Sequence, residues 1–159
     1  MDRFLSHYIL RLDAKGRVSV PAPFRALLAH DGIEGFYCCP ALDRSALEAG
    51  GNAFLAEIEQ LIARFPPFSE EREHFATALY ATSESVKMDG EGRVTLSDAL
   101  KDHAGIMHAA AFVGLGHKFQ IWAPDRFSAQ LSEATGKMRT LRKRLSVQSI
   151  AKDAHGARE

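Results

Sequence analysis

One twelve-residue segment occurs twice in this chain, and the repetition limits the folds that the chain can adopt. The first copy is LRLDAKGRVSVP, residues 10–21, and the second is VKMDGEGRVTLS, residues 86–97, at a constant offset of 76. In each copy, apolar and polar residues alternate on both sides of a short loop that contains Asp and Gly. Such alternation around such a loop predicts a β-hairpin. The chain therefore carries an internal duplication built on a strand-turn-strand unit.

The loop residues in both copies are those that a tight turn requires. Gly16 and Gly92 stand where a three-residue loop needs a left-handed backbone, which costs glycine little. Asp13 and Asp89 can accept hydrogen bonds from N–H groups of the turn and so fix its shape. We expect these four residues to shape the two turns.

Both copies continue in the same order. A helix start follows each turn, at residues 21–29 and again at residues 97–104, where Ser97 is a good N-cap. Strand patterns come next, at residues 35–39 and within residues 110–122. We expect an α+β fold that is mainly β with helices.

The segments outside the repeats have helical patterns. Between the copies, two helical periods separated by Pro66 and Pro67 predict a helical hairpin. The chain then divides into a first repeat (7–52), a helical connector (53–82), a second repeat (83–127) and a C-terminal basic amphipathic helix and tail (128–159).

Composition narrows the function classes. Lys and Arg total 20, as do Asp and Glu, so the whole surface is not a general nucleic-acid binder, although a local basic face is allowed. No apolar run approaches the roughly 18 residues of a membrane span, and the first residues lack a signal-peptide pattern. We expect a cytoplasmic protein. The adjacent Cys38 and Cys39 are expected to pack as small apolar residues, since neither disulfide geometry nor a zinc spacing fits them.

Patterns typical of catalysis are weak. The Gly-x-Gly at residues 114–116 leads into a strand pattern rather than a helix, so it does not resemble a nucleotide-binding loop. Glu71 and His74 form a single E-x-x-H pair, and the remaining histidines are scattered. We expect no enzyme activity, no metal, no cofactor and no small-molecule substrate.

Basic side chains at the two turns point instead to nucleic-acid binding. The arginine fork suits both phosphates and guanine edges. An alternative is that each loop Arg pairs with the Asp four residues before it and only staples the turn. Repetition of the loop favours binding, because a nucleic acid has a repeating backbone. The candidate DNA-binding residues are Arg17, Lys15, Arg93, Arg11 and Lys87.

These residues resemble the MraZ family, bacterial transcriptional regulators with two SpoVT-AbrB-type domains. The resemblance rests on LDAKGRVSVPAPFR, ATSESVKMDGEGRVTL and the HAGI and VGLGHKFQIW segments, and covers nearly the whole chain. It implies a swapped-hairpin (AbrB/MazE/MraZ-like) β-barrel formed by the two repeats, a homo-oligomeric ring and binding to double-stranded DNA at the nucleoid. The family's D-x-x-x-R element falls on Asp13 to Arg17 and on Asp89 to Arg93. Family targets are typically short direct repeats in the promoter of the division and cell-wall gene cluster, where the protein acts on its own operon.

Two questions stay open at the level of the sequence. Glu91 stands where the first copy has Lys15, so the two loops should bind phosphate unequally. The second question is the class of partner, because swapped-hairpin barrels also occur in antitoxins, which bind proteins. An antitoxin tail should be long and acidic, whereas residues 137–144 contain five basic residues in eight.

The C-terminal segment has two interpretations of its own. If residues 128–150 are helical, Leu131, Met138, Leu141 and Leu145 lie on one side, with basic residues on much of the remainder. This apolar stripe could pack on the helix's own barrel, or it could dock on a neighbouring subunit and bring positive charge to the DNA.

Overall fold

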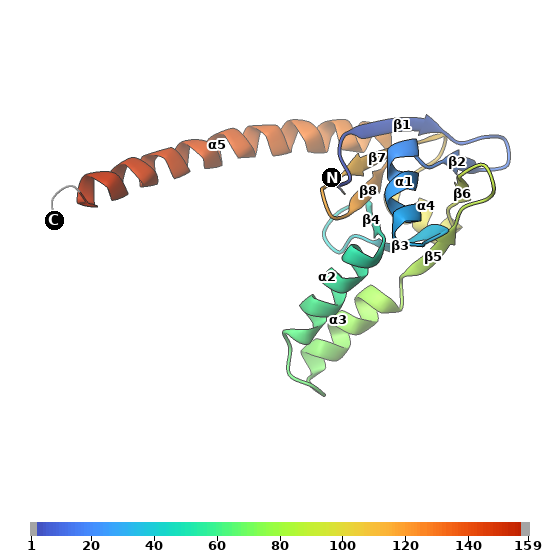
Figure 1. The fold of residues 1–159 in the computed structure, drawn as a ribbon, viewed down its shortest axis with the longest axis horizontal. Helices are drawn as coiled ribbons and strands as arrows, with labels where there is room; N and C mark the ends of the chain where they lie inside the picture. Colours follow the sequence, from blue (N-terminus) through green and yellow to red (C-terminus); the bar gives the residue numbers. More distant parts are fainter. Residues whose placement is uncertain (1–2, 157–159) are drawn as a thin grey trace. The chain divides into compact units, whose positions relative to one another are not determined.

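The computed structural model describes residues 3–156 and divides into two compact units, Met1–Pro124 and Asp125–Glu159 (Figure 1). In chain order the elements are β1 (His7–Arg11), β2 (Arg17–Ser19), α1 (Ala22–His30), β3 (Gly35–Pro40), β4 (Leu47–Gly50), α2 (Asn52–Ala63), α3 (Glu70–Tyr80), β5 (Glu84–Lys87), β6 (Arg93–Thr95), α4 (Asp98–Ala104), β7 (Ala109–Gly114), β8 (Phe119–Trp122) and α5 (Pro124–Gly156). Helices contain more residues than strands, so the fold is mixed α+β rather than mainly β, because the connector helices and α5 are long.

Strand pairing joins the two repeats to each other. A six-stranded sheet has the order β1-β7-β8-β4-β3-β5, and β2 and β6 form a separate two-stranded sheet. In the duplication, β1 corresponds to β5, β2 to β6, β3 to β7 and β4 to β8. The β1–β7 pair is therefore equivalent to the β5–β3 pair. The antiparallel β2–β6 and β4–β8 pairs each join a strand to its own counterpart. Val18 lies opposite Val94, its own counterpart at the offset of 76. The repeats are therefore related by an approximate two-fold axis.

The strands on either side of each turn do not pair with one another as a simple hairpin would. The turn itself is closed by backbone bonds, from Asp13 N–H to the Arg17 carbonyl (2.8 Å) and from Gly16 N–H to the Asp13 carbonyl (2.9 Å). Beyond it, β1 continues into the large sheet and β2 into the small one. Each strand thus finds a partner in the other repeat. Among the described residues, no backbone ladder joins the two sheets into a continuous barrel.

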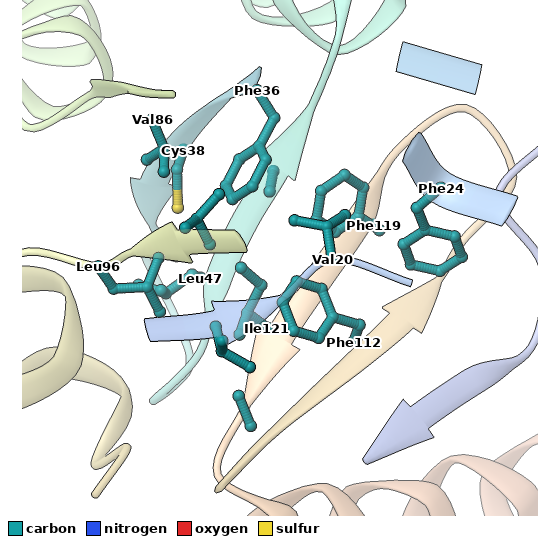
Figure 2. Close-up of a cluster of buried hydrophobic side chains, with 14 of the residues drawn as sticks. Val20, Phe24, Phe36, Cys38, Leu47, Val86, Leu96, Phe112, Phe119 and Ile121 are labelled. Carbon is teal, nitrogen blue, oxygen red and sulfur yellow. The ribbon is translucent and has the colours of Figure 1, made fainter. Parts of the chain in front are cut away.

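The core lies between these strands and is rich in phenylalanine. Figure 2 shows Phe24, Phe36 and Phe112 around Phe119, with ring centroids 5.1, 5.3 and 6.2 Å from that of Phe119. Val18 and Val94 of the small sheet belong to the same buried cluster. Burying such side chains stabilises the fold by roughly 1.5–3 kcal/mol each. Residues from both repeats and both sheets thus share one core.

The two cysteines pack as apolar residues. Cys38 and Cys39 are free thiols, and both are buried. Burial raises the pKa of Cys39 to about 11 and that of Cys38 well above its usual value. Both thiols therefore stay protonated and unreactive at neutral pH.

The connector is the helical hairpin that the sequence predicts. Helices α2 and α3 lie side by side in Figure 1 and bury Phe54, Ile58 and Leu79 against one another. Helix α3 begins at Ser69, whose hydroxyl accepts a hydrogen bond from the backbone N–H of Arg72. Ser97 caps α4 in the same way, as expected.

Helix α5 is longer than the predicted 128–150. It runs over Pro124–Gly156, and residues 157–159 of the expected tail lie outside the described residues. Leu131, Met138, Leu141 and Leu145, which form the apolar stripe, are 45–66% exposed. Among the described residues, no helix combines the length and apolarity needed to cross a membrane.

Candidate nucleic-acid interface

Residues 13–17 (loop 1) and 89–93 (loop 2) have the same shape, set by an Asp and a Gly. Asp13 Oδ1 accepts hydrogen bonds from the backbone N–H groups of Lys15 and Arg17, both at 2.9 Å. The equivalent bonds reach Asp89 Oδ1 in loop 2, at 2.9 and 3.0 Å. The glycines have φ values of 77° and 76°, in the left-handed region that favours glycine. Both loops are thus held in shape by hydrogen bonds to their own aspartate and by a glycine with a left-handed backbone.

The loop arginines pair with these aspartates. Arg17 Nε lies 2.8 Å from Asp13 Oδ2, and Arg93 Nε lies 3.0 Å from Asp89 Oδ2. The pKa of each aspartate is lowered, and the largest cause is the hydrogen bond from the backbone N–H of its arginine. The guanidinium side chain of the same arginine lowers this pKa further. The internal staple that the sequence left as an alternative is therefore present.

The staple does not use the whole guanidinium group. In Arg17 it engages Nε, and the terminal nitrogens of this residue have no other polar partner within residues 3–156. The Arg17 side chain is 29% exposed. Stapling and ligand binding are thus compatible, because the aspartate orients the fork while its terminal N–H groups remain available.

Loop 2 differs from loop 1 in its charge. Glu91 Oε2 lies 3.4 Å from Arg93 Nη2, so a second carboxylate engages the terminal nitrogen that remains available in Arg17. At the equivalent position, loop 1 has the exposed cation Lys15. Loop 1 therefore carries two cations and one carboxylate, whereas loop 2 carries one cation and two carboxylates.

Arg11 and Lys87 stand at equivalent places beside the loops. Each is the last residue of its strand, β1 or β5, and lies two positions before the loop aspartate. Both side chains are exposed. The fold thus keeps all five candidate residues on or next to the two loops.

Two further basic residues reach the loops from the opposite repeat. Arg25 of α1 donates from Nη1 to the Glu91 carbonyl of loop 2 at 3.1 Å. Lys101 of α4 has its Nζ 4.0 Å from where a Cβ on Gly16 would lie. Our sequence reasoning missed both, although they share the offset of 76 and so could have been found by aligning the helices that follow each loop.

The fold and the loops define a class of protein. Two loops of the same shape, each with an arginine held by an aspartate, are related by an approximate two-fold axis, an arrangement typical of proteins that bind a macromolecule. In the part of the chain that the structure describes, no group of three or more His, Cys, Asp or Glu residues could hold a metal ion.

Comparison with known proteins identifies the family. Residues 79–147 match the family model described as "MraZ protein, putative antitoxin-like". The chain is 61% identical to the transcriptional regulator MraZ of Xanthobacter autotrophicus, over 89% of this chain and 90% of the relative. It is 54% identical to that of Beijerinckia indica subsp. indica over the full length of both chains. Identity to the Azorhizobium caulinodans protein of the same name is 58%, over 91% and 92% of the two chains.

The chain belongs to the MraZ family of transcriptional regulators, which is not a family of enzymes. The resemblance read from the repeated loop is thereby confirmed.

Proposed function

We propose that the protein is a sequence-specific DNA-binding regulator that recognises short direct repeats in the promoter of its own operon. By the family resemblance, that operon lies in the division and cell-wall gene cluster, and the protein works in the cytoplasm at the nucleoid. The duplicated loop is the observation that carries the proposal. Loop 1 makes the main DNA contacts through Arg17 and Lys15. Arg93, Arg11 and Lys87 add weaker contacts.

Loop 1 has the properties that base or phosphate recognition requires. Its backbone is fixed by Asp13, so little conformational entropy is lost when DNA binds. Arg17 offers two terminal nitrogens in a fixed plane, the geometry that fits a guanine edge or a phosphate. Lys15 adds an exposed positive charge suited to the backbone.

A protein with a net charge of zero can still bind DNA tightly if several copies bind together. We propose a homo-oligomeric ring in which several copies of loop 1 meet consecutive DNA repeats. Linked sites gain affinity through their effective concentration, so each contact can be weak and the surface as a whole need not be basic.

The binding unit in this proposal is a swapped-hairpin barrel made of repeats 7–52 and 83–127, with the 53–82 connector and the 128–159 segment outside it. The cross-repeat pairing of every strand pair except β3–β4 and β7–β8 supports this arrangement. So does the shared core of the two sheets. The β2–β6 ribbon would then close the side that the larger sheet leaves open.

The family model is described as antitoxin-like, which favours one alternative to DNA binding: a protein-binding module on the same fold. Such a module would bind its partner through the C-terminal tail. The exposed basic residues of α5 disfavour a mimic of an acidic antitoxin tail. Retention on DNA that falls with salt separates the two functions.

The decisive experiment measures binding to DNA from the region upstream of the protein's own gene. Arg17→Ala should weaken specific binding by about 1–3 kcal/mol per engaged subunit, because it removes a bidentate contact. It also removes the staple to Asp13, so thermal unfolding must be measured alongside.

Arg17→Lys is the matched variant, because it keeps the charge but not the planar fork. Loss of specific binding in both variants with an unchanged melting temperature supports base recognition. Wild-type affinity in both folded variants would show that Arg17 serves the turn alone.

A further inference from the structure

The tip of the α2–α3 hairpin presents an unusual side chain. Phe68 is fully exposed and has a φ of 66°, in the left-handed region that a bulky residue rarely adopts. Both features cost free energy, because an apolar ring lies in water and the backbone is strained. Neither is needed to connect two helices, since glycine or asparagine would serve in this position.

The tip is ordered rather than loose. The Ser69 hydroxyl donates to the Pro66 carbonyl at 2.7 Å, and Arg72 Nη1 donates to the Phe65 carbonyl at 3.2 Å. Beneath the tip, the rings of Phe65 and Phe75 stack with centroids 4.7 Å apart. These contacts order the chain on both sides of Phe68, so its side chain projects from a fixed turn.

The same unit contains a cavity of the size that such a ring needs. The connector cavity has a volume of about 200 Å³. Its apolar wall comes from the β3–β4 loop, α2 and α3, and consists of Leu42, Phe54, Ile58, Leu61 and Leu79. A dry cavity of about 150 Å³ lined by similar residues is known to hold a benzene molecule. The connector cavity is partly open to solvent and has charged residues in its wall besides the apolar ones, and its volume is sufficient for a phenyl ring.

Phe68 does not occupy the connector cavity of its own chain. Its side chain is fully exposed, whereas the cavity wall follows α2 from Phe54 to Leu61. In this conformation, a phenylalanine ring that fills the cavity must come from another molecule.

We propose that the tip of the α2–α3 hairpin docks on a second copy of this chain, with Phe68 inserted into that copy's connector cavity. Charge supports this occupant. Glu70 and Glu71 lie two and three residues after Phe68 and are exposed. Arg44 is an exposed cation of the cavity wall beside Asp43, and the other carboxylates of the wall, Glu48 and Glu57, pair with Lys118. Glu70, Glu71 and Arg44 have no ion-pair partner among residues 3–156. Docking would bring the two acids to the arginine.

A contact of this kind is heterologous, since the tip and the cavity are different surfaces of the same chain. Repeating a heterologous contact closes a ring when the rotation allows it. The inference thus rests on the ring in the proposed function and supplies its subunit contact. It does not depend on which residues touch DNA.

The test uses one variant that lacks the tip side chain and one with a blocked cavity. Phe68→Gly removes the ring and relieves the backbone strain, so this variant should fold. Leu42→Glu puts a charge at the cavity, at a position that is 56% exposed and therefore tolerant. Sedimentation velocity should show each variant alone to associate at least about tenfold more weakly than the wild type, as loss of an aromatic anchor predicts.

Mixing the two variants gives the distinctive result. An equimolar mixture should form a one-to-one heterodimer, because the Leu42→Glu chain still has its Phe68 and the Phe68→Gly chain still has its cavity. Met107→Ala removes another exposed apolar side chain and should leave the assembly unchanged. Wild-type assembly of Phe68→Gly, or a mixture that stays dissociated, would overturn the proposal.

Charge exchange and DNA length provide two further readouts. Arg44→Glu and the double variant Glu70→Lys with Glu71→Lys should each weaken assembly, and their mixture should recover part of it.

Phe68→Gly should bind DNA with one repeat as well as the wild type does, but should lose avidity on several repeats. If the wild type is itself monomeric, the ring in the proposed function fails. If rings persist in Phe68→Gly, only this contact fails.

Discussion

Position 91 shows how a single residue separates two otherwise matching loops. Glu91 pairs with Arg93 Nη2 at 3.4 Å, whereas the equivalent Lys15 adds a positive charge beside Arg17, which pairs with Asp13 alone among residues 3–156. Glu91→Lys should therefore strengthen DNA binding, chiefly its nonspecific part. The salt dependence should steepen by about one phosphate contact per engaged loop. Titrations at several salt concentrations check this, and unchanged or weaker affinity would refute the inequality of the loops.

The loop aspartates predict a response to acid. The pKa of Asp13 is lowered by the hydrogen bond from the Arg17 N–H, and that of Asp89 by the bond from Arg93. A carboxyl whose pKa is lower in the folded state stabilises that state above its unfolded pKa of about 3.9. This contribution disappears as the pH falls through the lower, folded-state value.

We therefore expect both loops to loosen only in acid, as the pH falls through the lowered folded-state pKa values of the two aspartates, since protonation removes the charged acceptor. The NMR shift of the Arg17 amide should report this change. Asp13→Asn should abolish the titration in loop 1 and leave that of loop 2, which serves as the internal control. A loop 1 titration that survives in Asp13→Asn would contradict this explanation.

Among the elements, α5 has a second exposed apolar surface, separate from the tip of the α2–α3 hairpin. Its stripe of Leu131, Met138, Leu141 and Leu145 is 45–66% exposed. Lys137 pairs with Glu133 at 2.7 Å, and further basic residues follow it along the helix. Docking of this stripe on a neighbouring subunit would bring positive charge to the DNA.

Truncation after Phe127 tests this element. We expect a smaller assembly and a shallower salt dependence of DNA binding, because the stripe and its basic residues are both removed. Assembly size and affinity at two salt concentrations provide the measurement. Unchanged size together with an unchanged salt slope would refute docking, and loss of solubility alone would favour packing of the helix on its own chain.

In the whole molecule, the two repeats depend on each other. β1 pairs with β7, β2 with β6, β3 with β5 and β4 with β8, so every strand has a partner in the other repeat. A chain cut in the connector between residues 66 and 67 should give two fragments that are unfolded alone. Mixed in equal amounts, they should regain native circular dichroism. Independent folding of either fragment, measured against the intact chain, would contradict this dependence.

The sequence by itself determined the local structure. Each local signal acts on residues only a few positions away in the chain. These signals are the alternation around residues 13–17 and 89–93, the prolines after α2 and the cap at Ser97. Turn shape, helix positions and the positions of the basic residues follow from such short-range effects. The duplication was also visible, because the constant offset needs no structure to be seen.

Only the tertiary structure decided which strands pair and which helix reaches which loop. A strand of three residues such as β2 has almost no intrinsic preference for a partner, so burial of Val18 in a core shared by both repeats determines its pairing with β6. The same exchange brings Arg25 across to Glu91 and Lys101 toward Gly16. Contacts between residues so distant in the chain arise from packing of the whole core, which no local pattern encodes.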